Sequence, residues 1–518
     1  MVTRLGIDVG GTNTDAVILR GREVLAGVKR VTTADVMTGI GEALEAVITE
    51  AGIAREAIDV TMIGTTHFTN AVIERRALDP VAAIRLGLPA TACLPPMVDW
   101  PEDLVAEMGG HRYLLHGGYE FDGREIAALD EDGLIRVAED ITAKGIRAAA
   151  VSSVFSPINR AMEERARDIL QAHCPGLSVV LSSEIGRIGL LERESAAIMN
   201  ASLLTLSDQT VSAFARALSD AGLHCPFYVT QNDGTLMAAE MVRRFPVLTF
   251  ASGPTNSMRG AAFLTGVKDA IVIDIGGTTT DVGALQHGFP RQAASVVDVG
   301  GVRTNFRMPD VFSIGLGGGT RVTGGAKDVT VGPKSVGYRL TDEALVFGGE
   351  VLTCTDIAVA AGMAQIGDAS RVAGLDPALV AAARARINDM LETAVERSRV
   401  SPEPLPVIAV GGGSILAPDR IGDLEVLRPE NFAVANAVGA AIAQISGEVD
   451  RIFALENRTR EECLADADTE ARAAAIAAGA LESTLSVIER EDVPLAYLPG
   501  NATRIHVKVV GEMEGLDA

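Results

Sequence analysis

Two short segments of the chain hold the residue types that a phosphate-binding turn needs. The segment IDVGGTNTD at residues 7–15 returns as IDIGGTTTD at residues 273–281, about half a chain length downstream, and the copies agree at seven of nine positions. In each copy an apolar run ends in an aspartate, two glycines turn the chain, and Thr-x-Thr-Asp follows. The repeat predicts two related half-molecules that contribute one turn each.

The residue types of this turn favour a metal-bound nucleotide as the ligand. Glycines let the backbone approach an anion closely, and successive backbone N–H groups and threonine hydroxyls can surround phosphate oxygens. The aspartate that ends each apolar run would repel a bare phosphate, so it makes sense beside a cation such as Mg²⁺. The alternative is a pair of ordinary hairpins, since Gly-Gly is also turn chemistry. Two copies at half-chain spacing favour a shared site.

The elements around the first turn follow from hydrophobic periodicity. Apolar alternation predicts strands on both sides of the turn, in RLGIDVGG and in TNTDAVILRGREVLAGVKRV. Helical periodicity follows at residues 36–51, and VTMIGTT returns to a strand. From there to about residue 180, helical patterns alternate with short apolar strands, which is typical of an α/β domain.

The second half of the chain repeats this organisation. A helical pattern covers residues 191–222 without interruption, and a second α/β series runs from PFYVTQNDG through the second turn to LPVIAVGGGSILAP. After residue 450 the chain becomes more charged, with a helical pattern and a final strand-like RIHVKVV. We therefore expect an α/β fold with one lobe at residues 1–185, a second at 186–450 and an accessory segment at 451–518.

One segment of the first lobe lacks a sustained period. Residues 87–125 are rich in proline and glycine and hold the only tryptophan of the chain. Long loops inside compact domains are usually functional or mobile. We interpret this segment as a lid or substrate-facing insert.

Composition excludes several classes of partner. Lys and Arg total 45 against 68 Asp and Glu, and the net charge of -23 makes nucleic acid and anionic lipid poor partners. Five cysteines without a C-x-x-C pair suggest neither a disulfide framework nor a zinc site. We see no signal-peptide pattern and no apolar run of about 18 residues, so a soluble cytoplasmic protein without membrane contact is expected.

The paired turns resemble the two phosphate loops of the actin, heat-shock chaperone and sugar kinase superfamily, in which ATP lies between two ribonuclease H-like lobes. More narrowly, the chain resembles the hydantoinase A/oxoprolinase family, the ATP-binding subunits of enzymes that open cyclic amides. The resemblance runs from residue 3 to about 450. It is carried by GIDVGGTNTD (6–15), GTTHFTNAVIERR (64–76), SSEIGRIGLLERESAAIMNA (182–201), TQNDGTL (230–236), FASGPTNSMRGAA (250–262), VIDIGGTTTDVG (272–283) and GLGGGT (315–320).

The resemblance implies roles for individual residues. The first phosphate loop would comprise Gly10, Gly11, Thr12, Asn13 and Thr14, and the second Gly276, Gly277, Thr278, Thr279 and Thr280. Gly317, Gly318 and Gly319 would lie near the γ-phosphate, and Gly411, Gly412, Gly413 and Ser414 against the nucleoside. Of the catalytic carboxylates, Asp8 and Asp274 would hold Mg²⁺ through water. Asp15 or Asp281 would position the attacking oxygen, a choice that the sequence leaves open. Thr66, His67 and Asn70 are candidates for substrate contact.

The activity implied by the resemblance is ATP-dependent hydrolysis of a cyclic amide, of hydantoin, 5-oxoproline or lactam type, by phosphorylation of the amide carbonyl. The resemblance also implies a hydantoinase B-type subunit as the partner. The sequence leaves open whether the chain forms a homo-oligomer. The chain is shorter than the long family members and differs from them at residues 336–362, so the substrate is not carried over. Two alternatives stay open: the ATPase subunit of a ketone-carboxylase-like complex, and a chaperone-like regulatory ATPase of the same fold.

Overall fold

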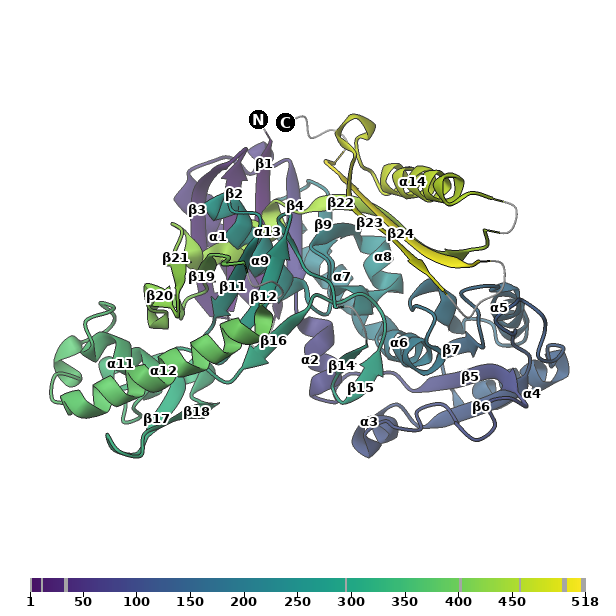
Figure 1. Ribbon diagram of the computed structural model, residues 1–518, viewed down its shortest axis with the longest axis horizontal. Coiled ribbons are helices and arrows are strands. Elements are labelled where there is room, and N and C mark those ends of the chain that lie inside the picture. The colour runs from purple at the N-terminus through teal and green to yellow at the C-terminus, as the bar shows by residue number, and fades with distance from the viewer. Residues whose placement is uncertain are drawn as a thin grey trace.

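The computed structural model describes residues 2–10, 13–31, 36–293, 296–399, 403–455, 458–495 and 501–513. It is an α/β protein built around three main sheets (Figure 1). None of the helices in these described ranges is both long and apolar enough to span a bilayer. The helices are α1 (Val36–Ala51), α2 (His67–Ile73), α3 (Glu102–Glu107), α4 (Glu131–Lys144), α5 (Ala161–His173), α6 (Leu190–Ser202), α7 (Leu204–Asp220), α8 (Ala239–Arg244), α9 (Ser252–Thr265), α10 (Leu340–Glu343), α11 (Cys354–Ala360), α12 (Pro377–Ser398), α13 (Ala435–Ala441) and α14 (Arg460–Ala477).

The first sheet carries the first turn and has the strand order β23-β24-β22-β10-β9-β4-β1-β2-β3. Its apolar strands are covered by α1 and α7 on one side, where their side chains form a continuous core with β1, β2 and β3. Its strands are β1 (Thr3–Val9), β2 (Asn13–Arg20), β3 (Glu23–Val31), β4 (Val60–Thr65), β9 (Phe227–Thr230), β10 (Thr235–Ala238), β22 (Gln444–Phe453), β23 (Ser486–Pro494) and β24 (Thr503–Gly511).

The second sheet carries the second turn and has the order β13-β12-β11-β19-β21-β20, with β16 also paired to β12. Its strands are β11 (Ala270–Ile275), β12 (Thr280–Gln286), β13 (Phe289–Pro290), β16 (Val311–Ile314), β19 (Val407–Val410), β20 (Arg420–Ile421) and β21 (Leu424–Leu427). The short strands β14 (Val297–Val299) and β15 (Val302–Thr304) form one hairpin, and β17 (Thr320–Thr323) and β18 (Thr330–Ser335) form another.

The two sheets share one local topology around their turns. β1 runs antiparallel to β2 and parallel to β4, as β11 runs antiparallel to β12 and parallel to β19. The register is also the same, because Asp8 lies opposite Asp15 and Asp274 lies opposite Asp281. The predicted α/β fold of two lobes with one turn each is therefore confirmed.

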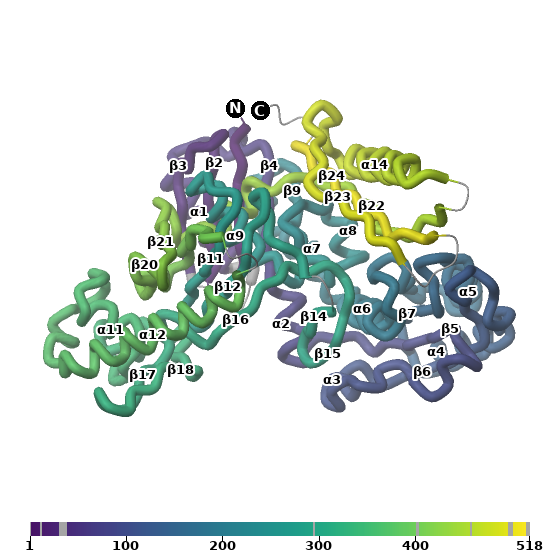
Figure 2. The backbone as a smooth tube through the Cα atoms, viewed as in Figure 1, coloured from purple at the N-terminus to yellow at the C-terminus, as the bar shows by residue number. Residues whose placement is uncertain are grey.

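A third, all-parallel sheet is inserted between β4 and β9, with the order β6-β5-β7-β8. Alternate residues of its central strands point to opposite faces, so one face packs on α4 and α5 and the other on α6. Figure 2 shows this unit and the unit of α11 and α12 at opposite ends of the molecule. The strands are β5 (Val81–Leu88), β6 (His111–His116), β7 (Ala148–Ser153) and β8 (Ser178–Leu181).

Several sequence expectations differ from these elements. The segment 87–125 is not a continuous loop, because it contains α3 and β6, and β6 pairs with β5. The helix expected over 191–222 is broken at Leu203, whose N–H donates to the Asn200 carbonyl in a tighter 3₁₀-type turn. The sheets also cross the expected divisions at residues 185 and 450: β9, β10 and β22 to β24 all extend the first sheet.

Two helices lie between the lobes and cross at very short distance. α9 packs on the second sheet through Met258 and Ala261, and α13 packs on the first sheet through Ala437 and Val438. At the crossing, a Cβ on Gly260 would come within 1.9 Å of the Ala435 carbonyl oxygen, and one on Gly439 within 1.8 Å of the Asn256 carbonyl oxygen. Only glycine fits at these two positions, so the crossing fixes how the lobes meet.

Candidate nucleotide site

The four predicted carboxylates lie at the inner ends of the two hairpins. Asp8 and Asp15 face each other across β1 and β2 and are buried, whereas Asp274 and Asp281 face each other across β11 and β12 and keep some contact with solvent. Gly64 of β4 leaves room for the first of them, because a Cβ there would lie 2.3 Å from Asp8 Oδ1. The structure thus brings all four predicted carboxylates into two matched pairs.

Helix α9 joins the two pairs through consecutive residues. Asn256 Nδ2 donates a hydrogen bond of 3.2 Å to Asp8 Oδ1, and Ser257 Oγ donates to Asp274 Oδ2. Side chains of neighbouring residues point about 100° apart around a helix, so Asn256 can contact one lobe while Ser257 contacts the other. Asn436 of α13 also donates to Asp8, at 3.4 Å from Oδ2.

The third strand of each sheet supplies a different partner. Lys29 of β3 lies opposite Asp15 and places Nζ 2.6 and 2.5 Å from its two carboxylate oxygens. In the second lobe the equivalent position on β16 is Ser313, whose Oγ donates to Asp281. The first pair therefore has a cation and the second only a hydroxyl.

Burial raises the pKa of every carboxyl group in this centre. It raises the pKa of Asp15 to about 6 despite the opposing effect of Lys29, and that of Asp281 to about 6 despite the Ser313 hydrogen bond. Burial also raises the pKa of Asp8 and Asp274, and the negative charge of Asp274 adds to the rise at Asp8. The centre is short of positive charge, which is the condition for binding a cation.

The two turns have the same internal hydrogen bond. Gly10 N donates to the Asn13 carbonyl at 3.0 Å, and Gly276 N donates to the Thr279 carbonyl at 2.9 Å. Gly11 and Thr12, predicted for the first loop, lie outside the described residues. The Thr14 side chain is buried.

In the second turn the threonines divide into two kinds. Thr278 and Thr279 expose their side chains at the open side of the turn. Thr280 is buried, and its Oγ1 donates to the Leu316 carbonyl at 2.7 Å. Thr280 therefore stabilises the turn from behind, while its two neighbours are free to contact a ligand.

Both predicted glycine-rich segments lie against the second turn. Gly318 N and Gly319 N donate to the Gly276 and Gly277 carbonyls at 3.0 and 2.7 Å, and a Cβ on Gly317 would come within 2.6 Å of Thr278 N. Thr355, in the first turn of α11, holds this segment through a 2.9 Å hydrogen bond from its Oγ1 to the Gly318 carbonyl.

The adenosine-loop candidates approach the same turn from the end of β19. Gly413 N donates to the Ile275 carbonyl at 2.7 Å. Gly411 has φ of +84°, and a Cβ there would lie 2.2 Å from Asp274 Oδ1, so glycine is required on both counts. Gly412 has open space where a side chain would be, and the buried Ser414 Oγ has no hydrogen-bond partner within the described residues.

The three candidates for substrate contact lie beside the first turn. Thr66 N donates to the Val9 carbonyl at 3.3 Å, and Asn70 Nδ2 donates to Thr66 Oγ1 at 3.4 Å. His67 begins α2, and burial lowers its pKa, so the imidazole is neutral at pH 7. These residues are near the first turn, and their role in binding substrate stays a prediction.

The donor set fits Mg²⁺ bound in part through other ligands. The described ranges hold no group of three His, Cys, Asp or Glu side chains close enough to enclose a metal ion. Mg²⁺ usually takes one or two carboxylates, with substrate phosphates and water completing its shell. Asp8 and Asp274, both short of compensating positive charge, match that requirement.

Sequence reasoning missed the residues that organise the carboxylates. Asn256 and Ser257 stand in the segment FASGPTNSMRGAA, which carries the family resemblance but gave no hint of which carboxylate each would contact. Lys29 had a weak signal, because a three-stranded antiparallel meander places it opposite Asp15 if the turns are short. No pattern in the sequence pointed to Asn436 or Ser313.

The fold and the site define a class: two-lobe α/β proteins whose lobes each bring a glycine-rich turn and an acidic pair to a common centre. Within that class the chain belongs to the hydantoinase/oxoprolinase family. Its residues 4–174 match the hydantoinase/oxoprolinase N-terminal region, and residues 193–368 match the hydantoinase/oxoprolinase model. The resemblance inferred from the motifs is confirmed.

Three relatives illustrate the similarity. The chain is 27% identical to the acetophenone carboxylase gamma subunit of Aromatoleum aromaticum, over 70% of this chain and 53% of the relative. It is 26% identical to the caprolactamase subunit alpha of Pseudomonas jessenii, over 85% of this chain and 65% of the relative. The crystal structure of the ATP-dependent caprolactamase from Pseudomonas jessenii has a TM-score of 0.79 at 20% identity, covering 99% of this chain and 89% of that one. The chain thus spans between half and two-thirds of the length of these curated relatives.

Proposed function

We propose that this chain is the ATP-binding, phosphoryl-transferring part of an enzyme that opens a cyclic amide. The observation that carries the proposal is the link through α9, which hydrogen-bonds Asp8 of one lobe and Asp274 of the other through consecutive residues. A nucleotide between two such turns would contact both lobes at once. The similarity to a caprolactamase subunit supports an amide as the acceptor.

In this proposal the chain acts mainly by positioning and by charge. The exposed side chains of Thr278 and Thr279 and the backbone N–H groups of the turns bind phosphate oxygens. Asp8 and Asp274 would hold a magnesium ion, which would supply positive charge beside the phosphate groups. Asp15 or Asp281 positions the attacking oxygen, with Lys29 adding a positive charge beside the first of them.

The reaction follows from the poor electrophilicity of an amide. The carbonyl oxygen of the ring attacks the γ-phosphorus of ATP, the bond to the β-phosphate oxygen breaks, and ADP leaves. Water then adds to the carbon of the phosphorylated imidate, and the C–N bond of this tetrahedral intermediate breaks to release the amine and leave an acyl phosphate. A second water hydrolyses the acyl phosphate to a carboxylate and phosphate. Phosphoryl transfer of this kind needs placement and charge stabilisation more than covalent chemistry.

The test is ADP release by the purified chain with caprolactam, hydantoin or 5-oxoproline, each with and without a hydantoinase B-type subunit. We expect one of these amides to raise ADP release and to be consumed in equal amount. A B-type partner is part of the proposal because the relatives are named as subunits. If no amide stimulates ADP release in either setting, the amidohydrolase proposal is wrong.

A second candidate is the ATPase subunit of a ketone-carboxylase-like complex. The similarity to an acetophenone carboxylase gamma subunit favours it. The same ADP assay, with acetophenone or acetone and bicarbonate in place of the amide, separates the two candidates. Stimulation by a ketone and bicarbonate, with no response to any amide, would favour this second proposal.

A further inference from the structure

A cavity of about 650 Å³ lies away from the four carboxylates of the nucleotide site, between the first sheet and the inserted parallel-sheet unit. Its walls include parts of two family-like segments, 182–201 and 230–236, which the nucleotide site does not use. They also include β22 and the segment after β15. Cavities of this size hold small organic ligands.

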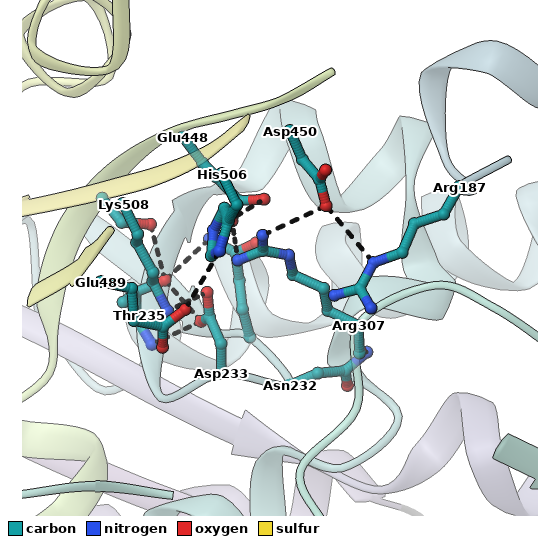
Figure 3. Close-up of polar contacts among 12 residues, drawn as sticks. Arg187, Asn232, Asp233, Thr235, Arg307, Glu448, Asp450, Glu489, His506 and Lys508 are labelled. Carbon is teal, nitrogen blue, oxygen red and sulfur yellow. Dashed lines mark hydrogen bonds and ion pairs between the residues drawn. The ribbon is translucent and has the colours of Figure 1, made fainter. Parts of the chain in front are cut away.

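Three arginines meet on one carboxylate, Asp450, in the wall of this cavity, and Figure 3 shows two of them, Arg187 and Arg307. Arg504 binds Asp450 in bidentate fashion, with Nε and Nη2 at 2.7 and 2.5 Å. Arg187 Nε lies 3.4 Å and Arg307 Nη2 lies 3.6 Å from Asp450 Oδ2. Asp450 is thus hydrogen-bonded to Arg504 and is the common ion-pair partner of all three guanidinium groups.

The acceptors in this wall do not satisfy the donors. Each guanidinium has five N–H donors, and a carboxylate has about four acceptor positions. Arg307 also forms an ion pair with Glu448, yet its Nη1 and Nη2 and Arg187 Nε are buried without a well-directed hydrogen bond within the described residues. Buried polar groups are normally hydrogen-bonded, whereas these three atoms have carboxylates nearby but no well-directed hydrogen bond to them.

The nearby charges leave an excess of positive charge. Arg187, Arg307 and Arg504 share Asp450 and Glu448 as ion-pair partners, while Asp233 is paired with Lys508 at 2.6 Å. Burial lowers the pKa of His506 to about 2, with Arg307 adding to the effect, so this histidine is neutral. In a chain with a net charge of -23, a cavity wall in which three arginines share two carboxylates is an exception, and it favours an anionic ligand.

The arginines are held in place by backbone contacts between distant segments. Asn232 Nδ2 donates to the Arg307 carbonyl at 3.0 Å, and Asn305 Oδ1 accepts from Arg187 N at 3.2 Å. Asn232 Oδ1 in turn accepts from Ala251 N, which precedes α9. Preorganised guanidinium groups lose little entropy when they bind a planar anion.

We propose that this cavity binds a small organic carboxylate, whose two oxygens are received by Arg187 and Arg307 while its carbon skeleton lies against apolar wall residues. Ile158, Ile185 and Phe306 supply that apolar surface. A carboxylate matches the fork of a guanidinium in two parallel hydrogen bonds. The cavity is separate from the paired turns, and the proposal does not depend on the reaction proposed above.

The test uses the full chain and isothermal titration calorimetry with glutarate as the probe. We expect glutarate to bind, the neutral analogue glutaramide not to bind, and Arg187→Gln to weaken glutarate binding at least tenfold. Arg165→Gln is the matched control, because Arg165 lies outside the cavity lining, is exposed and is paired with Glu131. This control should bind glutarate within twofold of the wild type. Arg307→Gln is a second variant, but its deeper burial makes a folding defect the larger risk.

Three results would overturn the proposal. If Arg187→Gln binds glutarate as tightly as the wild type, the arginines do not bind the ligand. If no heat of binding is measured up to about 10 mM glutarate, the cavity does not bind a carboxylate. Inorganic phosphate binding more tightly than glutarate would change the ligand class. Mg-ATP affinity is measured in parallel: Arg187→Gln should leave it unchanged, so failure here is distinguishable from failure of the nucleotide proposal.

Discussion

The molecule has two buried charged centres of opposite sign, and they are built in opposite ways. The centre between the lobes gathers four carboxylates with one lysine, and each carboxylate comes from a local turn that occurs twice in the sequence. The cavity gathers Arg187, Arg307 and Arg504 from three segments that lie far apart in the sequence. The first centre is an acidic site suited to a metal-bound phosphate, and the second is a basic site suited to an anion.

The comparison also predicts opposite responses to the loss of a charge. In the acidic centre the four carboxylates have hydrogen-bond donors but share one lysine, and Asp274 raises the pKa of Asp8, so neutralising one carboxylate should relieve repulsion. In the basic centre the charges are interlocked, so removal of one leaves its partner buried and alone. The following four experiments test that difference, from the largest expected effect to the smallest.

Lys508→Met should give the largest loss of stability. Lys508 is fully buried and pairs with Asp233 at 2.6 Å, and a buried carboxylate left unpaired costs about 3 to 5 kcal/mol. The free energy of unfolding from urea titration measures the loss. The double variant Lys508→Met, Asp233→Asn should recover much of it, and Lys268→Met at an exposed position is the control. A loss below about 1 kcal/mol would contradict the interlocked character of this centre.

Asp8→Asn and Asp274→Asn should each weaken Mg-ATP binding about 100-fold or more, a change of about 3 kcal/mol in binding free energy. Their melting temperatures without nucleotide should stay equal to the wild type or rise, because a buried charge has been removed. Calorimetric titration and thermal melting measure the two effects, with exposed Asp220→Asn as the control. If both variants keep the wild-type affinity for Mg-ATP, the proposed site between the two lobes is wrong.

Lys29→Met and Ser313→Ala compare the third-strand partners of the two acidic pairs. Loss of Lys29 removes the cation from the buried Asp15 and should cost about 2 kcal/mol of unfolding free energy, whereas loss of the Ser313 hydroxyl should cost about 1 kcal/mol. Denaturant titration at pH 7 measures both. Equal effects would show that the lysine contributes no more than a hydrogen bond.

His506→Gln should change the pH dependence of stability rather than its value at pH 7. Burial depresses the pKa of His506 to about 2 in the folded protein, while the unfolded chain takes up a proton near pH 6.5. The stability that depends on neutral His506 is therefore complete above pH 6.5 and is lost as pH falls below it, by about 1.4 kcal/mol per unit. The wild type should lose more stability than the variant between pH 6.5 and 5.5.

The control for this variant is His224→Gln, which removes a histidine at an exposed position. Its unfolding free energy should follow the wild-type pH dependence over the same range. If His506→Gln and the wild type lose stability in parallel, the neutral state assigned to His506 is wrong.

Sequence reasoning reached the acidic centre because its information is local. The turns, the four carboxylates and the two glycine-rich segments each occupy a few consecutive residues, so their types and spacing predict their chemistry. The shared register of Asp8 with Asp15 and of Asp274 with Asp281 then follows from a tight hairpin. Sequence reasoning did not predict the hydrogen bonds from Asn256 to Asp8 and from Ser257 to Asp274, because these depend on where α9 packs.

The basic centre was out of reach for a different reason. β9, β10 and β22 join the first sheet although more than 150 residues separate β9 from β4, and such pairings leave no local pattern. Arg187, Arg307 and Arg504 meet only once that sheet order is known. The same gap explains why the expected lobe divisions did not follow the sheets.

The consecutive placement of Asn256 and Ser257 also limits how this chain can change over generations. One residue inserted between the start of α9 and Asn256 would rotate both side chains by about 100° and withdraw them from both carboxylates together. The glycine crossing with α13 prevents the helix from turning back to compensate. Substitutions can accumulate along α9, but its length and rotational phase are locked to the two lobes that it joins.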